Sequence, residues 1–329
     1  MNKKALIIGV SGQDGSYLAR LLIEKGYHVY GTSRDHEVTT FSNLSKLKIK
    51  NHVVLRSMTA SDFRSVLTTL QEVEPDEIYN LAGQTSVGLS FLYPVETFES
   101  ISVGTIHILE CLRILKKEIR FYNAGSSEVF GNAIKPAHEE TPFRPRSPYA
   151  TAKAAAHYAV ANYREAYELF ACTGILFNHE SPLRPERFVT QKIISAAVRI
   201  AAGSQERLKL GNLSIHRDWG WAPEYVEAMW KILQHEKPED FIVATGRMHS
   251  LEEFVQKTFE QMGLRSCDYV DADATLLRPS DIEKSIGNPS KAETLLKWQA
   301  RVTLDKIIAQ MIEGRQKEIA SNKDLIRES

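Results

Sequence analysis

Residues 5–15 read ALIIGVSGQDG, an apolar run that leads into three closely spaced glycines. The run is short and apolar, as expected of a buried parallel strand, and a helical stretch at 16–25 follows the last glycine. Glycines in such a turn let the backbone amides at the helix start approach a pyrophosphate without a Cβ in the way. We therefore predict a dinucleotide-binding turn made of Gly9, Gly12, Gln13, Asp14 and Gly15.

The same alternation of short apolar runs and helical stretches continues outward from this turn. Further strands are predicted at 28–33, 53–57, 77–81, 120–124, 170–176 and 241–245, and further helices at 62–72, 95–115, 148–168 and 250–262, the last capped by Ser250. This alternation is typical of a Rossmann-type α/β fold with a doubly wound parallel sheet.

After Asn178 the pattern loosens, because four of the 12 prolines fall between Pro182 and Pro238. We expect a smaller, mostly α/β domain there that caps the substrate. The dinucleotide-binding domain would comprise 1–177 and about 215–246, and the substrate domain 178–214 and 247–329.

Composition excludes several classes of protein. The 41 basic residues balance the 41 acidic ones, and no apolar run approaches the ~20 residues of a membrane span, so we expect neither a nucleic-acid partner nor a membrane. The three cysteines are far apart, which favours a reducing, cytoplasmic compartment. Neither the cysteines nor the ten histidines show metal-ligand spacing, so no metal site is expected.

The end of the second predicted strand bears on cofactor choice. An acidic residue about 20 residues beyond the glycine turn usually holds the ribose 2′-hydroxyl of NAD. Here Ser33 and Arg34 suit a 2′-phosphate, whereas Asp35 would repel one if it pointed inward. The alternative is that Arg34 and Asp35 are surface charges of a loop. We favour NADP over NAD.

A tyrosine and a lysine one helical turn apart suggest redox chemistry. Tyr149 and Lys153 share one face of the predicted helix 148–168, and a nearby ammonium lowers the pKa of a tyrosine so that it can accept a hydroxyl proton. Such a pair is common by chance. However, Ser126 and Glu128 directly follow a predicted strand, at the edge where open α/β sheets place their sites.

Longer strings resemble the extended short-chain dehydrogenase/reductase superfamily and, within it, the GDP-mannose 4,6-dehydratases. They are GVSGQDGSYLARLL (9–22), EIYNLAGQTSV (77–87), FYNAGSSEVFG (121–131), RSPYATAK (146–153), NYREAYELFACTGILFNHESP (162–182), FVTQKI (188–193), RDWG (217–220) and LRPSDIEKSIGNPSKA (277–292). The resemblance implies that Tyr149 and Lys153 form the redox pair and that Ser126 replaces the family's more usual threonine. It also makes Glu128 the acid and base for carbons 5 and 6 of a GDP-sugar.

The resemblance further implies binding residues and a homodimer or homotetramer. Leu81 joins the glycine turn at the cofactor, and the residues implied for the nucleotide sugar are Gln84, Ser86, Asn178, Glu186, Lys192, Arg217 and Arg278. A carboxylate such as Glu186 can accept both N–H groups of guanine, and arginines fit phosphate oxygens. Alternatively, Arg217 could pair with its neighbour Asp218, and Arg278 could be a loop charge.

Some positions depart from the family's pattern. Asp35 replaces a second arginine, Ser57 replaces an aspartate that touches adenine, and Pro185, Arg187 and Gln191 alter the loop implied to bind guanine. The substrate could therefore be GDP-mannose or a related GDP-manno sugar such as a heptose. A GDP-4-keto-6-deoxy-sugar reductase or an epimerase on the same fold is the alternative, followed by a non-catalytic dinucleotide sensor.

Overall fold

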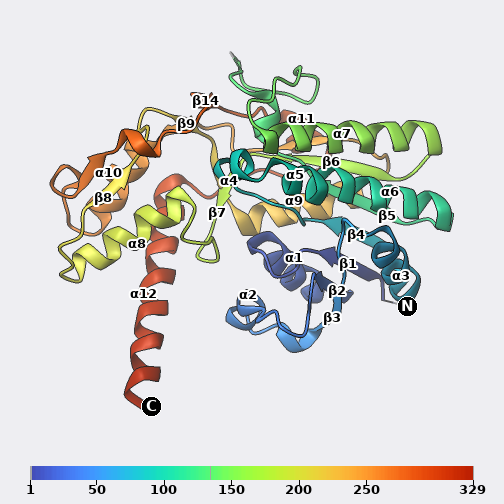
Figure 1. The fold of residues 1–329 in the computed structure, drawn as a ribbon, viewed down its shortest axis with the longest axis horizontal. Helices are drawn as coiled ribbons and strands as arrows, with labels where there is room; N and C mark the ends of the chain where they lie inside the picture. The colour runs from blue at the N-terminus through green and yellow to red at the C-terminus, as the bar shows by residue number, and fades with distance from the viewer. Residues whose placement is uncertain (1, 134, 329) are drawn as a thin grey trace.

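A seven-stranded parallel sheet is formed by strands between Lys4 and Val243 (Figure 1). The computed structural model describes residues 2–133 and 135–328. The strand order is β11-β6-β5-β4-β1-β2-β3, so the order reverses between β1 and β4. The strands are β1 (Lys4–Ile8), β2 (His28–Ser33), β3 (Val53–Ser57), β4 (Glu77–Asn80), β5 (Arg120–Ala124), β6 (Ala171–Leu176) and β11 (Phe241–Val243). Each lies within two residues of its predicted range, and the Rossmann-type fold is confirmed.

Helices cover both faces of this sheet, as the alternation of side chains in β1 requires. Ala5 and Ile7 belong to a buried cluster with α1 (Gln13–Glu24) and α9 (Ala222–Gln234). Leu6 and Ile8 belong to another, with α3 (Phe63–Val73), α6 (Gly104–Leu115) and α7 (Pro148–Tyr167). Because successive side chains of a strand point to opposite faces, one apolar run supplies both cores.

The predicted helix 95–115 is confirmed, with one π-helical turn inside it. It comprises α5 (Pro94–Phe98), one π-helical turn (Glu99–Val103) and α6. Within that turn, the Ser102 hydroxyl donates to the carbonyl oxygen of Ala152 on α7 at 2.9 Å, and Ile101 packs with Tyr149. The irregular turn therefore lies against the part of α7 that carries the predicted redox pair.

A second body of helices and short strands lies at the carboxyl end of the sheet (Figure 1). Its helices are α8 (Val189–Ala201), α10 (Leu251–Gln261) and α12 (Leu304–Glu328), which share a buried cluster that includes Ile193, Phe254 and Ile308. The predicted cap of α10 is confirmed, since the Ser250 hydroxyl accepts from the amide of Glu253 at 3.0 Å. The domain boundaries expected from the sequence stay a prediction.

Short strands connect the two bodies. β7 (Asn178–Glu180) pairs with β10 (Trp219–Trp221), β8 (Leu208–Leu210) with β13 (Val270–Ala272), and β9 (His216–Arg217) with both β12 (His249–Ser250) and β14 (Lys284–Ser285). The remaining helices are α2 (Ser42–Lys46), α4 (Val87–Leu92) and α11 (Ser290–Leu295). None of the described helices is both long and apolar enough to cross a membrane.

Candidate active site

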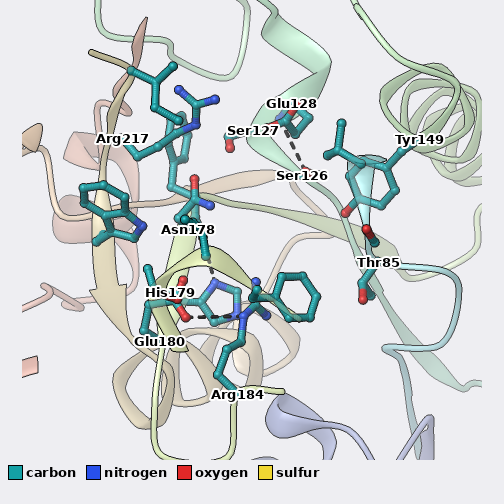
Figure 2. A pocket seen from close by; sticks show the side chains of 18 of the residues that line it. Thr85, Ser126, Ser127, Glu128, Tyr149, Asn178, His179, Glu180, Arg184 and Arg217 are labelled. Atoms are coloured by element: carbon teal, nitrogen blue, oxygen red, sulfur yellow. Dashed lines mark hydrogen bonds and ion pairs between the residues drawn. The ribbon is translucent and has the colours of Figure 1, made fainter. Parts of the chain in front are cut away.

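A cavity of about 380 Å³ opens where the carboxyl ends of β4, β5 and β6 meet the second body. Its lining combines residues of the sheet region with residues from 178–281 (Figure 2). Of the predicted site residues it includes Asp14, Leu81, Ser86, Ser126, Glu128, Tyr149, Lys153, Asn178, Lys192, Arg217 and Arg278. The structure thus brings together side chains that are more than 200 residues apart in the sequence.

The glycine turn fits a pyrophosphate. Gly9 has φ +90°, and a Cβ on Gly15 would lie 2.4 Å from the carbonyl oxygen of Gly9, so both positions require glycine. Gly12 is the N-cap residue of α1, and no side chain accepts a hydrogen bond there. The first backbone amides of the helix are therefore available to an anion. These observations match the predicted role of the turn.

Gln13 and Asp14 tie the turn to β7. Asp14 Oδ2 lies 2.8 Å from Nε2 of His179, and the Ser181 hydroxyl donates to Oε1 of Gln13 at 2.8 Å. Burial alone would raise the pKa of Asp14, but His179 outweighs it and the pKa is lowered. Burial alone would lower the pKa of His179, but Asp14 raises it. The two side chains therefore form a partly buried ion pair beside the cavity.

Tyr149 and Lys153 are buried side by side at the start of α7. The Lys153 ammonium donates to the carbonyl oxygen of Ala124, the last residue of β5, at 2.7 Å, and lies 5.9 Å from the centre of the Tyr149 ring. Burial raises the pKa of Tyr149 to about 12, an effect that a hydrogen bond with Ser126 partly offsets. Burial lowers the pKa of Lys153 to about 8. The lowered tyrosine pKa expected from the sequence is therefore not found, because burial dominates.

Glu128 lies in a 3₁₀ turn (Ser127–Phe130) directly after β5. The Ser126 hydroxyl accepts from the amide of Glu128 at 3.3 Å. Burial raises the pKa of Glu128, while Arg217 and Arg278 act in the opposite direction. Figure 2 shows Ser126, Glu128 and Tyr149 on one side of the cavity and Arg217 on the other. A carboxyl with a raised pKa can both give and take a proton near neutral pH.

Arg217 lies on β9, is 4% exposed and forms part of the cavity lining. It donates to the carbonyl oxygen of Ile282 at 2.7 Å and to Oδ1 of Asp281 at 3.1 Å. Arg278 approaches the same oxygen at 3.6 Å. The local pair with Asp218 left open by the sequence is not formed, because the Asp218 carboxylate accepts from Thr245 and the amide of Gly246.

Seven predicted residues are not in the cavity lining: Gly9, Gly12, Gln13 and Gly15 of the glycine turn, together with Arg34, Gln84 and Glu186. Arg34 is exposed at the end of β2, Gln84 donates to the carbonyl oxygen of Ser86 at 2.7 Å, and Glu186 pairs with two arginines. These partners are Arg199, at 2.8 Å, and Arg315, at 3.0 Å. The roles predicted for Arg34, Gln84 and Glu186 stay predictions.

The sequence analysis did not single out several residues that line the cavity: Thr85, His179, Glu180, Arg184 and Asp281. His179 and Glu180 lie within the string 162–182 and Asp281 within 277–292, so both strings contained a signal. Within residues 2–133 and 135–328, no group of three His, Cys, Asp or Glu side chains could hold a metal ion.

Comparisons with known proteins agree with this geometry. The family model described as GDP-mannose 4,6 dehydratase matches residues 6–311. GDP-mannose 4,6 dehydratase 1 of Arabidopsis thaliana is 44% identical over 94% of this chain and 89% of its own length. GDP-mannose 4,6 dehydratase of Dictyostelium discoideum is 41% identical, over 94% of this chain and 95% of its own.

A solved structure shares the fold at much lower identity. The UDP-glucose 4-epimerase of Thermotoga maritima superposes with a TM-score of 0.86 at 21% identity, over 96% of this chain and 99% of that one. The chain is thus similar to the curated dehydratases over nearly its whole length, and to the epimerase in its fold.

Proposed function

Since this chain belongs to the GDP-mannose 4,6-dehydratase family and dehydrates GDP-mannose, we propose that it works by internal hydride transfer with bound NADP and releases the GDP-4-keto-6-deoxy sugar. The observation that carries the mechanism is the convergence of Ser126, Glu128, Tyr149 and Lys153 on one cavity, with Arg217 opposite. Gly9, Gly12 and Gly15 would hold the diphosphate of the dinucleotide, and Leu81 lies in the adjoining wall.

Tyr149 acts at the 4-hydroxyl of the sugar. When bound, a nicotinamide would hold the hydride that is removed in the oxidation of carbon 4 until carbon 6 is reduced. Tyr149 accepts the hydroxyl proton as the oxidation proceeds, and the hydrogen bond with Ser126 favours its ionised form. With a pKa of about 8, Lys153 remains mostly protonated at pH 7, and its ammonium stabilises the phenolate.

Glu128 acts at carbons 5 and 6. The ketone at carbon 4 acidifies the hydrogen on carbon 5, and the Glu128 carboxylate removes that hydrogen as a proton. The same carboxyl group then gives this proton to the hydroxyl that leaves carbon 6 as water. When carbon 6 is reduced, carbon 5 takes up the proton that Tyr149 accepted from the 4-hydroxyl, so that all protons are accounted for. A buried carboxyl whose pKa is raised by burial suits this double role.

The cations of the second body would hold the nucleotide diphosphate. Arg217 and Arg278 flank the cavity and are joined through Asp281, while Lys192 lines it from α8. Guanidinium groups bind phosphate oxygens in a bidentate manner, and Asn178 adds an amide to the same wall. Glu186 is the proposed reader of guanine.

The conformation of Asp35 supports NADP over NAD. Its Oδ1 accepts from the backbone amides of Glu37 at 2.9 Å and Val38 at 3.4 Å. Because this carboxylate caps its own turn, it is not directed at a ribose hydroxyl, and its repulsion of a 2′-phosphate is reduced. The exposed Arg34 beside Ser33 then remains as the partner for a 2′-phosphate.

The exposed apolar side chains of two neighbouring helices support a homodimer or homotetramer. Val103, Ile106 and Ile114 in or beside α6, and Tyr158 and Tyr167 on α7, are each at least 38% exposed. Exposed apolar groups of this size on adjacent helices are typical of an interface between subunits. Light scattering of the purified protein measures the assembly, and a monomeric mass would contradict it.

One incubation tests the proposed reaction against its alternatives. GDP-mannose is added to the protein without any reductant, and the products are followed by mass and by the ketone. A dehydratase yields a 4-keto product 18 mass units lighter with no net consumption of NADPH, by the loss of water. A reductase leaves GDP-mannose unchanged, and an epimerase yields an isomer of equal mass. A parallel incubation with a GDP-manno-heptose tests the altered loop, of which Arg187 lines the cavity.

A further inference from the structure

Glu180, the last residue of β7, is a carboxylate in the cavity wall that the proposed mechanism does not use. Its side chain is 2% exposed and lies beside Asn178 and His179 (Figure 2). Burial raises its pKa, and Arg184 opposes that effect. Because a buried carboxylate is costly without a compensating partner, its relation to Arg184 needs an explanation.

The contact between these two side chains is close but incomplete. Oε2 of Glu180 lies 3.3 Å from Nε of Arg184. Among the described residues, however, neither atom has a hydrogen bond of acceptable geometry. The Arg184 guanidinium also lies over the ring of Phe188, with its central carbon 3.7 Å from the ring centre. Carboxylate and ring together therefore fix the guanidinium at the edge of the cavity.

Arg184 is also linked to the cofactor side of the cavity. Its charge lowers the pKa of both Asp14, in the first turn of α1, and Tyr149, so it lies within electrostatic reach of each. The turn that carries it is attached to α1, because the Arg184 amide donates to Ser181 at 3.0 Å and the Ser181 hydroxyl donates to Gln13. Asp14, Tyr149 and Arg184 also line the same cavity, so the guanidinium shares that cavity with the first turn of α1 and with the proposed redox pair.

We propose that Glu180 is a positioning residue, whose carboxylate holds the Arg184 guanidinium toward the diphosphate of the bound dinucleotide. This inference rests on the proposed use of a nicotinamide dinucleotide. A planar guanidinium can keep a carboxylate at its Nε edge and present its terminal nitrogens to phosphate oxygens. Arg184 touches the anion, and Glu180 acts only through Arg184.

Binding titrations of the purified full-length protein test this relationship without relying on turnover. NADP, NAD and GDP are each titrated into the wild type, Glu180→Gln, Glu180→Asp, Arg184→Met and the variant with both Glu180→Gln and Arg184→Met. We expect Glu180→Gln to weaken NADP and NAD by the same factor, about tenfold, because both share the diphosphate. Glu180→Asp keeps the charge and should restore most of the affinity, and GDP affinity should not change.

The double variant distinguishes positioning from a general structural role. If Glu180 acts through Arg184, the double variant binds no more weakly than Arg184→Met alone. Glu239→Gln is the matched control, since Glu239 pairs with Lys291 outside the cavity lining, and it should leave all three affinities unchanged.

Three results would overturn the inference. The first is that Glu180→Gln binds NADP and NAD as tightly as the wild type. The second is that the losses of dinucleotide affinity in the two single variants multiply in the double variant. The third is that Glu180→Gln loses affinity for GDP alone. If Glu180→Gln does not fold, the titrations of Glu180→Asp and Arg184→Met test the inference instead. Unchanged dinucleotide affinity in Arg184→Met would contradict a contact between Arg184 and the diphosphate. Failure of the wild type to bind any dinucleotide would instead contradict the proposed function.

Discussion

His179 and Asp14 form an ion pair that joins β7 to the first turn of α1, with 2.8 Å between Nε2 and Oδ2. The folded protein raises the pKa of His179 above its ordinary 6.5 and lowers the pKa of Asp14 below 3.8. The contribution of His179 is therefore complete below about pH 6.5 and is lost as the pH rises through its folded pKa. The contribution of Asp14 is present above about pH 3.8 and is lost as the pH falls through its own lowered value.

Replacement of Asp14 by Asn should consequently destabilise the protein most between about pH 4 and 6.5. We expect a loss of about 3 kcal/mol in the free energy of unfolding there, because the substitution leaves a buried imidazolium unpaired. The loss should shrink toward pH 9. Urea unfolding of both proteins across this range measures it, and a loss independent of pH would show that the pair is not ionised.

Cofactor selectivity depends on Arg34. Arg34→Ala should weaken NADP binding by about 1.5–3 kcal/mol, the range for hydrogen bonds to charged groups, and leave NAD nearly unchanged. Arg56 is a matched control, because it is exposed on the neighbouring strand β3 and, among the described residues, donates only to the carbonyl oxygen of its neighbour Leu55. Titration of both dinucleotides measures the effect, and equal losses for NADP and NAD would reject the assignment.

The sequence predicted the sheet well because the signals for its strands are local. Each short apolar run, such as Ala5–Ile8, shows the composition of a strand buried on both faces, whatever lies elsewhere in the chain. The π-helical turn inside the helix predicted at 95–115 has no such local signal. The irregular turn accompanies a contact between Ser102 and Ala152 on another helix, which sequence periodicity does not contain.

The candidate site also contains some relationships that follow from nearby residues in the sequence and others that depend on the fold. Tyr149 and Lys153 lie one helical turn apart, so their proximity follows from the sequence. The pairing of Asp14 with His179 spans 165 residues and depends on how β7 meets α1. The direction of the Tyr149 pKa shift was wrong in the sequence argument, because burial by the surrounding residues outweighs the nearby charges.

The proposed binding of guanine by Glu186 can be tested separately from the ion pairs that Glu186 forms with Arg199 and Arg315. Glu186→Gln replaces one carboxylate acceptor by an amide donor, so we expect weaker GDP binding and no change for ADP. The partly exposed pairs with Arg199 and Arg315 should contribute less than about 1 kcal/mol to folding. Titration with GDP, ADP and UDP tests this, and equal affinities of the wild type for all three would contradict the role.

The dehydration chemistry makes Tyr149 and Glu128 fail at different steps. Tyr149→Phe removes the group that accepts the proton of the 4-hydroxyl, so turnover should fall at least about 100-fold with no ketone and no reduced cofactor. Glu128→Gln keeps the size of the side chain but cannot exchange protons at carbons 5 and 6. Oxidation at carbon 4 should then proceed while elimination stalls.

Single-turnover absorbance in the NADPH band distinguishes the two variants. Glu128→Gln should give a burst of enzyme-bound reduced cofactor that persists, whereas the wild type should give a transient and Tyr149→Phe no signal. Solvent deuterium should enter carbon 5 in the wild type and not in Glu128→Gln, because carbon 5 can take up a new proton only after Glu128 has removed its hydrogen. If Glu128→Gln dehydrates GDP-mannose at nearly the wild-type rate, the carboxyl near Arg217 is structural and another group must carry out the elimination.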